Sequence, residues 1–373
     1  MSEYNESTVP PVQEPKMSGP VTSVPSPEKS SKKTRYGCIT CGAILIFLAI
    51  LVFLGLCVFF ILSAVSNSSQ ISSIFKINPY GSYQEVFVDG DDLSMNKIAV
   101  IDVKGVIVDG ESSFYSVADA TRISDQIKYI IHDGNVKAVV LDIDSPGGEV
   151  VASDSIHHEL GRLRQETGIP IVAVMRSLGA SGAYYIAAGS DYIIANRMTI
   201  TGSIGVIIET YKYHELFKKI GVEGEVFKSG AMKDILNGAR PSTPQEKAVV
   251  QNLVGQTYSE FVQIVANGRK NLSGEKIKTS IIGDGRIFDG AEAHKLGLVD
   301  QLGFFEDAVE KAAELANVGS DYKAVRYEEP FSFGSLFRSS EASSSNLSIS
   351  LGNSAKSFSL EKGRLYFLPG AFY

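Results

Sequence analysis

Three short stretches of the chain combine small residues with groups that could act on a substrate. DSPGGEV occupies residues 144–150, GASGAYY residues 179–185 and FKSGAMKDI residues 227–235. The first offers backbone N–H groups at a double glycine, the second a serine hydroxyl, and the third two lysines. An anion-binding turn and a nucleophile are two of the parts that hydrolysis through a covalent intermediate requires.

Each stretch also has an ordinary structural interpretation. DSPGGEV could simply turn a strand into a helix, and Ser181 could be the N-cap of the helix that follows it. The two lysines could lie in a solvent-exposed loop around Gly230. The nearest histidines, His157, His158 and His214, lie in stretches that do not look built to meet Ser181. The base for this serine must therefore be sought elsewhere.

The elements that must position these stretches alternate between strand and helix. Apolar runs predict strands at KIAVIDVKGVIV, VKAVVLDID, IPIVAVM, DYIIAN, SIGVIIET and EGEVF. Isoleucines 123, 127, 130 and 131 mark one face of a helix. Further helices are predicted at 149–166, 181–189, 211–220, 244–268, 289–296 and 304–316. This alternation predicts an α/β fold with a largely parallel sheet and helices flanking it.

Composition bounds the class of partner. The chain has 373 residues, 44% of them hydrophobic, and a net charge of -7. Nucleic-acid-binding proteins usually carry a basic face, so nucleic acid is not expected as a partner. No ordered set of His, Cys or carboxylate residues has the spacing of metal ligands, and we expect no metal and no cofactor.

An apolar run over residues 42–65 predicts a single transmembrane helix, since about 20 helical residues span a bilayer. The alternative, a cleaved signal peptide, usually has an apolar region of only about 7–15 residues. The basic KSSKKTR before it places the N-terminus in the cytoplasm. Residues 1–35 then form a disordered cytoplasmic tail, 66–94 a stalk, 95–330 the outer domain and 331–373 a Ser-rich tail that ends in the apolar RLYFLPGAFY.

The three cysteines, Cys38, Cys41 and Cys57, all lie in or beside this apolar run. The first two form a C-x-x-C, which could indicate metal or redox chemistry. No second pair of ligands lies nearby, so small interfacial residues or acylation sites are the favoured interpretation. The outer domain contains no cysteine and must be stabilised by its core.

Five motifs in order resemble the signal peptide peptidase A family, membrane-bound serine peptidases of the ClpP/crotonase-like superfamily. They are DSPGGEVVASDSI, GASGAYYIA, TGSIGV, KSGAMKDI and GDGRIFDGAEAHKLGLVDQLG, and the resemblance covers roughly residues 95–330. The family has one-copy and two-copy forms. Because this chain has no internal repeat, it resembles the one-copy form.

The resemblance implies a Ser–Lys dyad, matched residue by residue, in which Ser181 is the nucleophile and Lys233 the general base. Ser203 of TGSIGV matches the hydroxyl that positions the lysine, and the backbone N–H groups of Gly148 and Gly182 match the oxyanion hole. Lys233 is favoured over Lys228 because Lys228 would end the EGEVF strand in water. A free lysine has a pKa of about 10.4, and burial lowers it towards the working range.

The resemblance also implies a function and a place. We expect a membrane-anchored endopeptidase, assembled as a homo-oligomeric ring, that degrades cleaved signal peptides and other hydrophobic peptides. Its catalytic domain would lie outside the bacterial cytoplasmic membrane. The alternatives are a catalytically inactive crotonase-like membrane scaffold and a protease for membrane-protein quality control.

Overall fold

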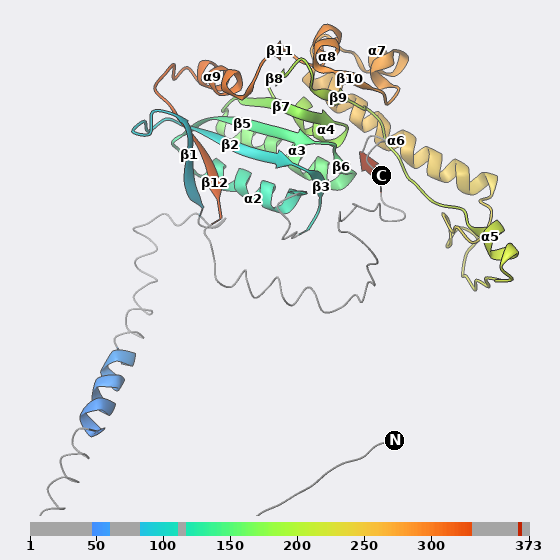
Figure 1. Cartoon of the computed structure of the whole chain (residues 1–373), viewed down its shortest axis with the longest axis horizontal. Helices are drawn as coiled ribbons and strands as arrows, with labels where there is room; N and C mark the ends of the chain where they lie inside the picture. The colour runs from blue at the N-terminus through green and yellow to red at the C-terminus, as the bar shows by residue number, and fades with distance from the viewer. Residues whose placement is uncertain (1–46, 60–82, 111–116, 330–364, 368–373) are drawn as a thin grey trace, which may run out of the picture. The chain divides into compact units, whose positions relative to one another are not determined.

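The computed structural model describes residues 47–59, 83–110, 117–329 and 365–367 (Figure 1). The chain divides into two units, residues 1–75 and 76–373. The second unit contains all the strands that are described, and it is the unit that carries the candidate site.

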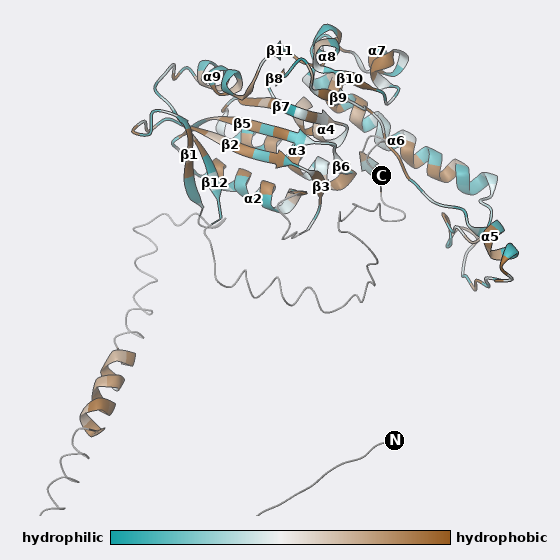
Figure 2. Cartoon of the chain, in the orientation of Figure 1, coloured by the Kyte–Doolittle hydropathy of each residue, from teal (hydrophilic) through white to brown (hydrophobic). Residues whose placement is uncertain are grey.

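Of the predicted transmembrane segment 42–65, the structure describes residues 47–59, which are helical. Figure 2 shows this helix as hydrophobic along its length, and its large side chains are exposed. Within the described ranges no helix has both the length and the hydropathy that a bilayer crossing requires. The ends of the predicted segment and the predicted tail 1–35 lie outside the described residues.

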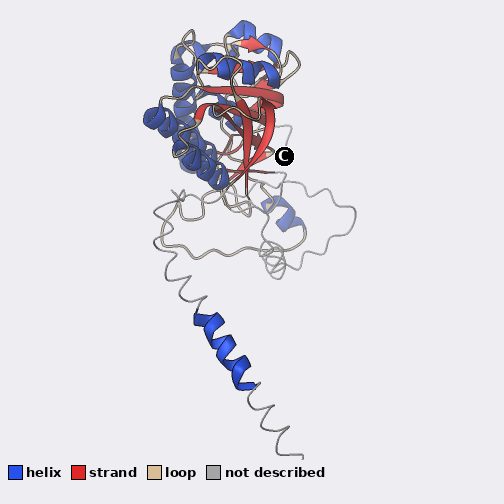
Figure 3. Cartoon of the chain, turned by 90° about the vertical axis from the view of Figure 1, so that its left-hand side faces the viewer, coloured by secondary structure: helices blue, strands red, loops and turns tan. Residues whose placement is uncertain are grey.

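The second unit is a mixed α/β structure, as the alternating pattern predicts (Figure 3). Its strands are β1 (Gln84–Gly90), β2 (Lys97–Lys104), β3 (Val106–Val108), β4 (Val117–Asp119), β5 (Val136–Ser145), β6 (Gly148–Glu149), β7 (Ile171–Ala180), β8 (Tyr192–Ala195), β9 (Ile200–Gly202), β10 (Ile287–Asp289), β11 (Gln301–Leu302), β12 (Lys323–Glu328) and β13 (Tyr366–Phe367). Its helices are α2 (Ala120–Ile131), α3 (Val150–Thr167), α4 (Gly182–Ala188), α5 (His214–Lys219), α6 (Pro244–Gly268), α7 (Gly274–Thr279), α8 (Gly290–Leu296) and α9 (Phe305–Leu315), with a 3₁₀ turn at Ile281–Gly283.

The main sheet runs in the order β1-β12-β2-β5-β7-β8-β11, and every pair from β12 to β11 is parallel. Strand β9 pairs in parallel with the end of β7 and antiparallel with β10. A second, smaller sheet has the order β13-β6-β3-β4. The two sheets meet at the carboxyl ends of the central strands, where parallel α/β sheets commonly place their sites.

Two apolar cores lie on the two faces of the main sheet. Alternate residues of β2 point to opposite sides, so Ile101 belongs to one core and Val100 to the other. Helices α2, α3, α4 and α6 contribute to the first core, and α9 to the second. The strand β5 is buried on both faces, which fits its almost continuous apolar sequence.

Three predicted strands are wrong in detail. KIAVIDVKGVIV breaks at Gly105, where a φ of 81° lets the chain leave the main sheet and enter the small one. SIGVIIET forms only an isolated bridge, between Ile207 and Tyr366. EGEVF forms no strand: its residues are exposed, and Phe227 is 88% exposed, because no strand within the described ranges pairs with them.

Candidate active site

Ser181 lies at the turn between β7 and α4, with no exposed surface and with a φ of 55°. A positive φ at a residue other than glycine costs about 1–3 kcal/mol, and such residues gather at functional sites. The Ser181 N–H donates to the carbonyl of Gly202 (2.8 Å), and its carbonyl accepts from the N–H of Tyr185 (2.8 Å). These backbone bonds hold the strained turn from both sides.

The hydroxyl of Ser181 takes no part in these bonds. It sits at the N-cap position of α4 but makes no capping hydrogen bond. Its Oγ is buried and has no hydrogen-bond partner among the residues that the structure describes. Leaving a buried hydroxyl unpaired costs about 1–3 kcal/mol, so a serine kept only as a helix cap is not what the geometry shows.

The double glycine of DSPGGEV makes a turn that no larger residue fits. Gly147 has a φ of 98°, and a Cβ there would lie 2.2 Å from the Phe367 carbonyl oxygen and 2.6 Å from the Gly182 amide nitrogen. A Cβ on Gly148 would lie 1.9 Å from the carbonyl oxygen of Ile107. The close approach of these backbones therefore requires both glycines.

Gly182 closes the same small space from the side of α4. A Cβ there would lie 2.5 Å from Ser153 Oγ and 3.2 Å from the amide nitrogen of Gly148. The amides of Gly148 and Gly182 thus converge next to Ser181, each at the start of a helix. This is the arrangement in which backbone N–H groups can stabilise a developing oxyanion.

Ser203 lies beside Ser181 because their strands are paired. Ala180 of β7 is opposite Gly202 of β9, so each serine is the first residue after its strand. Ser203 has a φ of 50°, is 5% exposed, and donates its N–H to the carbonyl of Arg286 (2.8 Å). A cavity of about 450 Å³ opens beside it, lined by residues of 203–207, 283–285 and the middle of α6.

The described chain does not bring Lys233 to these residues. Lys233 lies in an exposed turn between α5 and α6, and its side chain has no hydrogen bond or ion pair with a described residue. In Figure 1 this part of the chain lies at the far end of α6 from α4. At α4, Gly268 of α6 approaches Ala188 so closely that a Cβ there would lie 1.8 Å from the Ala188 carbonyl oxygen.

A chain of ion pairs ties the Lys233 turn to the start of α6, the end of that helix far from Ser181. Asp234 pairs with Arg240 (2.6 Å), and Arg240 pairs with Glu246 in the first turn of α6. Phe261, which contacts Tyr185 next to Ser181, lies 15 residues further along that helix. At 1.5 Å per residue this is about 22 Å, far more than a lysine side chain can cross.

Of the two lysines, Lys228 is the one whose side chain is fixed by hydrogen bonds and an ion pair. Its Nζ donates to the Asp234 carboxylate (2.6 Å) and to the carbonyl of Ala231 (3.1 Å). The expected contrast, in which Lys228 ends a strand in water and Lys233 is desolvated, is not present within a single chain. Lys228 is committed to an ion pair, whereas Lys233 is free to meet another surface.

The C-terminal strand β13 occupies the groove beside Ser181, which the sequence did not predict. Phe367 pairs antiparallel with Gly148, and Tyr366 exchanges two backbone hydrogen bonds of 3.2 Å with Ile207. Both side chains are 1% exposed. The only sequence signal for this strand is that the Ser-rich tail ends in an apolar stretch, RLYFLPGAFY.

Comparison with known proteins places the chain among peptidases. Residues 163–319, which contain Ser181, Ser203 and Lys233, match Peptidase family S49. The putative signal peptide peptidase SppA of Enterococcus faecium is 39% identical over 251 residues, 66% of this chain and 71% of that protein. A putative protease of Synechocystis is 44% identical over 60% of this chain and 76% of its own length. Protease 4 of Haemophilus influenzae is 36% identical over 61% of this chain, but the match spans only 36% of that protein.

Proposed function

The chain belongs to the signal peptide peptidase A family of S49 peptidases, and from that premise we propose a membrane-anchored serine endopeptidase with a Ser181–Lys233 dyad. Its substrates are cleaved signal peptides and similar hydrophobic peptides. The observation that carries this proposal is the buried, strained and unpartnered hydroxyl of Ser181 beside two converging backbone amides. The family's ClpP/crotonase-like fold agrees with the α/β architecture.

The proposed reaction has two steps through an acyl-enzyme. Neutral Lys233 takes the proton of the Ser181 hydroxyl as Oγ attacks the scissile carbonyl carbon. The N–H groups of Gly148 and Gly182 donate to the resulting oxyanion. When the C–N bond breaks, the proton passes from lysine to the leaving amine. The same lysine then takes a proton from a water molecule that attacks the ester carbonyl, and it gives that proton to Ser181 Oγ as the bond between Oγ and the acyl carbon breaks.

We propose that the lysine reaches this site from a neighbouring copy in a ring. A lysine acts as a base only when its amine is neutral, and that requires removal from water. In the single chain Lys233 is exposed and lies before the start of α6, about 22 Å of helix away from Phe261 and the Ser181 turn, so its own Ser181 is out of reach. The cavity beside Ser203 offers a place in which a lysine from another copy would meet a hydroxyl.

The exposed side chains around Lys233 support such an association. Large apolar groups in this part of the chain are open to solvent, and a neighbouring copy would cover them: Tyr211, Leu216, Ile220, Val222, Val226, Phe227 and Met232. Isolated exposed apolar residues are normal, but a run of them along one projecting segment marks a binding surface. A strictly monomeric, fully active protein in light scattering at micromolar concentration would refute the ring.

The membrane anchor is proposed from the sequence of residues 42–65. The run carries no charge, and its described part, 47–59, is a helix with exposed apolar side chains. Basic residues before it favour a cytoplasmic N-terminus and a catalytic unit outside the cytoplasmic membrane. Fractionation of cells would test this, since release of the intact chain by carbonate or salt alone would contradict an anchor.

Digestion of a panel of signal peptides by the full chain in detergent tests the activity. We expect cleavage within the apolar regions by the wild type and none by Ser181→Ala. A fluorophosphonate probe separates the peptidase from an inactive scaffold, because only an activated serine is labelled. If the probe labels neither Ser181 nor any other residue and no peptide is cut, the chain is a scaffold.

A further inference from the structure

Arg269 lies at the far end of α4, the helix that begins directly after Ser181. It is the residue that follows α6, and its side chain is only 3% exposed, which is rare for an arginine. Its Nη1 donates to Asp300 Oδ2 (2.5 Å), and its Nη2 donates to the backbone carbonyl of Ser190 (3.2 Å). Ser190 lies two residues beyond the end of α4. A buried guanidinium therefore joins the end of this helix to Asp300.

A second arginine holds the same end of α4. Arg164 of α3 donates from Nη2 to the backbone carbonyl of Gly189 (2.6 Å) and pairs with Asp191 (3.1 Å). The last carbonyl groups of a helix have no partner within the helix, and cations stabilise that end. Arg164 is 40% exposed, however, whereas Arg269 is enclosed. Of the two arginines, Arg269 is therefore the one whose position is fixed by surrounding atoms.

The segment that ends at Asp300 also holds the middle of α4. Tyr184 is completely buried, and its hydroxyl donates to the backbone carbonyl of Leu298 (2.8 Å). Burial raises the pKa of Tyr184, so the hydroxyl keeps the proton that it donates. Asp300 in turn accepts a hydrogen bond from the N–H of Ile193 in β8 (2.8 Å). Two side-chain contacts, from Tyr184 and from Arg269, thus fasten α4 to a segment that is itself bonded to the main sheet.

The helix between this attachment and the proposed nucleophile is short. It has seven residues and is about 10 Å long, with Ser181 and Gly182 at its start. At its end, Gly268 packs so closely that a Cβ there would lie 1.8 Å from the Ala188 carbonyl oxygen. A shift of this end would therefore move the Ser181 hydroxyl and the Gly182 N–H with it. A misplacement of about 1 Å in reacting groups can cost about 10²-fold in rate.

We propose that Arg269, through its pair with Asp300, is a positioning residue that sets where α4 holds the Ser181 hydroxyl and the Gly182 N–H. This inference rests on the proposed function and deepens it. A buried ion pair adds little net stability, because the loss of hydration of both charges offsets their attraction. An apolar side chain of similar volume is often as stable in its place. The guanidinium adds direction instead, since its planar fork holds two acceptors at fixed angles.

The first test replaces the guanidinium by an apolar side chain of similar length. Arg269→Met should lower kcat for signal peptides by about 10- to 100-fold while KM changes little, since the reacting groups move and the peptide contacts stay. Arg269→Lys keeps the charge but can satisfy only Asp300 or Ser190, so its kcat should lie between those of Met and wild type. Fluorophosphonate labelling of Ser181 should slow in the same order, because the probe needs the serine and the amides but no peptide groove.

Chemical rescue separates positioning from folding. Arg269→Ala leaves room for a guanidinium ion, and Asp300, whose side chain is 34% exposed, borders that space on the solvent side. Guanidinium chloride, far below the molar concentrations that unfold proteins, should raise kcat of this variant severalfold. Sodium chloride at the same concentration should not. Guanidinium destabilises folded proteins, so a variant whose only defect is lost stability would lose activity instead.

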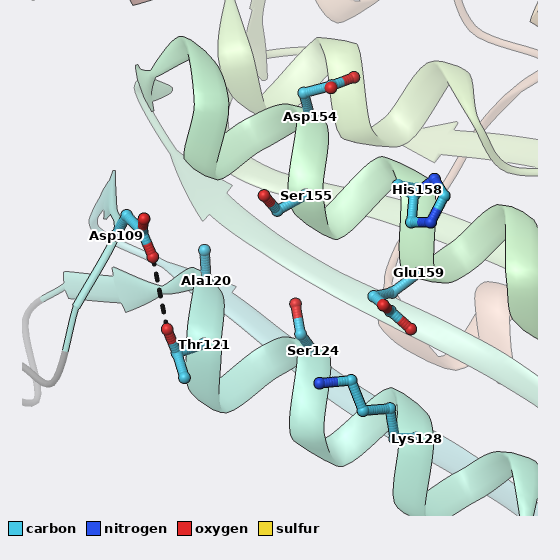
Figure 4. Close-up of a pocket in the computed structure, with 9 residues that line it drawn as sticks. All are labelled: Asp109, Ala120, Thr121, Ser124, Lys128, Asp154, Ser155, His158 and Glu159. Atoms are coloured by element: carbon cyan, nitrogen blue, oxygen red, sulfur yellow. Dashed lines mark hydrogen bonds between the residues drawn. The ribbon is translucent and has the colours of Figure 1, made fainter.

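Two matched variants control for lost charge and for lost stability. Arg162→Met removes a partly exposed arginine of α3 that pairs with Glu159 (2.9 Å), which lines a polar pocket of about 360 Å³ between α2 and α3 (Figure 4). Surface ion pairs contribute little, so this variant should keep the wild-type kcat. Val309→Ala removes buried methyl groups of α9 from the core on the other face of the main sheet. It should lower the midpoint of thermal unfolding and leave kcat unchanged.

Two results would overturn the inference and leave the proposed function standing. One is an Arg269→Met variant with the wild-type kcat and the wild-type labelling rate of Ser181. The other is a loss of kcat in Arg269→Met that Val309→Ala reproduces, together with no response of Arg269→Ala to guanidinium. A wild-type chain that neither cuts peptides nor labels at Ser181 would overturn the proposed function, and this inference with it.

Discussion

The turn that carries Ser181 and the segment that carries Lys233 are built in opposite ways. Ser181 lies among backbone atoms so close that glycine is required at Gly147, Gly148 and Gly182, and it has no exposed surface. Lys233 lies in a turn whose neighbours are open to solvent, held mainly by surface ion pairs. The proposed nucleophile is fixed by the fold of one chain, whereas the proposed base lies on an exposed surface.

Under the proposed ring, this contrast gives a physical reason why a single chain would be inactive. The strained serine turn costs stability and is stabilised by a large buried core. The lysine segment has few buried contacts, so it can adapt to a partner at small cost. An active site completed only by assembly would act only inside an enclosed ring, where folded proteins cannot enter.

The largest effect on kcat is expected for a substitution in the rigid turn that carries Ser181. Ser181→Ala removes the attacking oxygen and should lower kcat by about 10⁴–10⁶. Because alanine adds no atoms to the turn, the midpoint of thermal unfolding should stay within a few degrees of the wild type. Peptide turnover and a melting curve, measured on one preparation, check both. A tenth of the wild-type turnover would exclude Ser181 as nucleophile.

Substitution of Lys233, in the exposed segment, should have the next largest effect on kcat. Lys233→Ala should lower kcat by about 10²–10⁴, the usual contribution of a general base. Lys228→Ala, the matched control in the same segment, should cost far less, since Lys228 serves an ion pair with Asp234. Rates measured from pH 6 to 10 compare the two. An active Lys233→Ala with an inactive Lys228→Ala would reverse the assignment.

Glycine substitutions test whether the rigid turn is needed for chemistry. Gly147→Ala places a methyl group 2.2 Å from the Phe367 carbonyl oxygen and 2.6 Å from the amide nitrogen of Gly182, a proposed oxyanion donor, and should lower kcat by about 10²–10³. Gly161→Ala in the middle of α3 is the control, because nothing lies within 4 Å of its Cβ position. That change should be neutral or slightly stabilising. Equal losses in both would show that helix α3, rather than the turn, is sensitive.

Removal of β13 should change binding and leave the chemistry alone. A chain ending before residue 365 has no strand in the groove, so KM for short peptides should fall by about tenfold while kcat stays constant. Initial rates over a range of peptide concentrations separate the two constants. A lower kcat would mean that β13 completes the site rather than competing for it.

The smallest effect concerns the charge network of the lysine segment. Hydrogen bonds from Arg240 and then Lys228 lower the pKa of Asp234, and the hydrogen bond from Arg240 lowers that of Glu246 to about 2. A lowered pKa adds stability above the unfolded value near 4, and that stability is lost as pH falls through the folded value. The protection of the backbone amides of residues 228–243 against hydrogen exchange, relative to the intrinsic exchange rate at each pH, should therefore fall below about pH 4. Protection in β5 should persist to lower pH. Simultaneous opening of both would contradict a separately held segment.

The sequence predicted most of what is local. The buried run before DSPGGEV, the turn itself and helix α3 follow from periodicity and glycine, and Ser181 is predicted at the start of a helix, where α4 begins. The incorrect and missing predictions concern contacts between distant parts of the chain, which a local sequence pattern does not reveal. EGEVF has the composition of a strand but pairs with none of the described strands, and Phe367 pairs with Gly148 from more than 200 residues away. The separation of Lys233 from Ser181 follows from the length of α6 and its packing.

Mixing two inactive variants tests the central claim most directly. Ser181→Ala retains every lysine, and Lys233→Ala retains every serine. If the dyad forms between copies, mixed rings will regain activity in about a quarter of their sites, since each site needs one intact serine and one intact neighbouring lysine. The account predicts that turnover returns when the two are dissociated in detergent and reassembled together. Mixed rings, verified by two affinity tags, that remain inactive would contradict it.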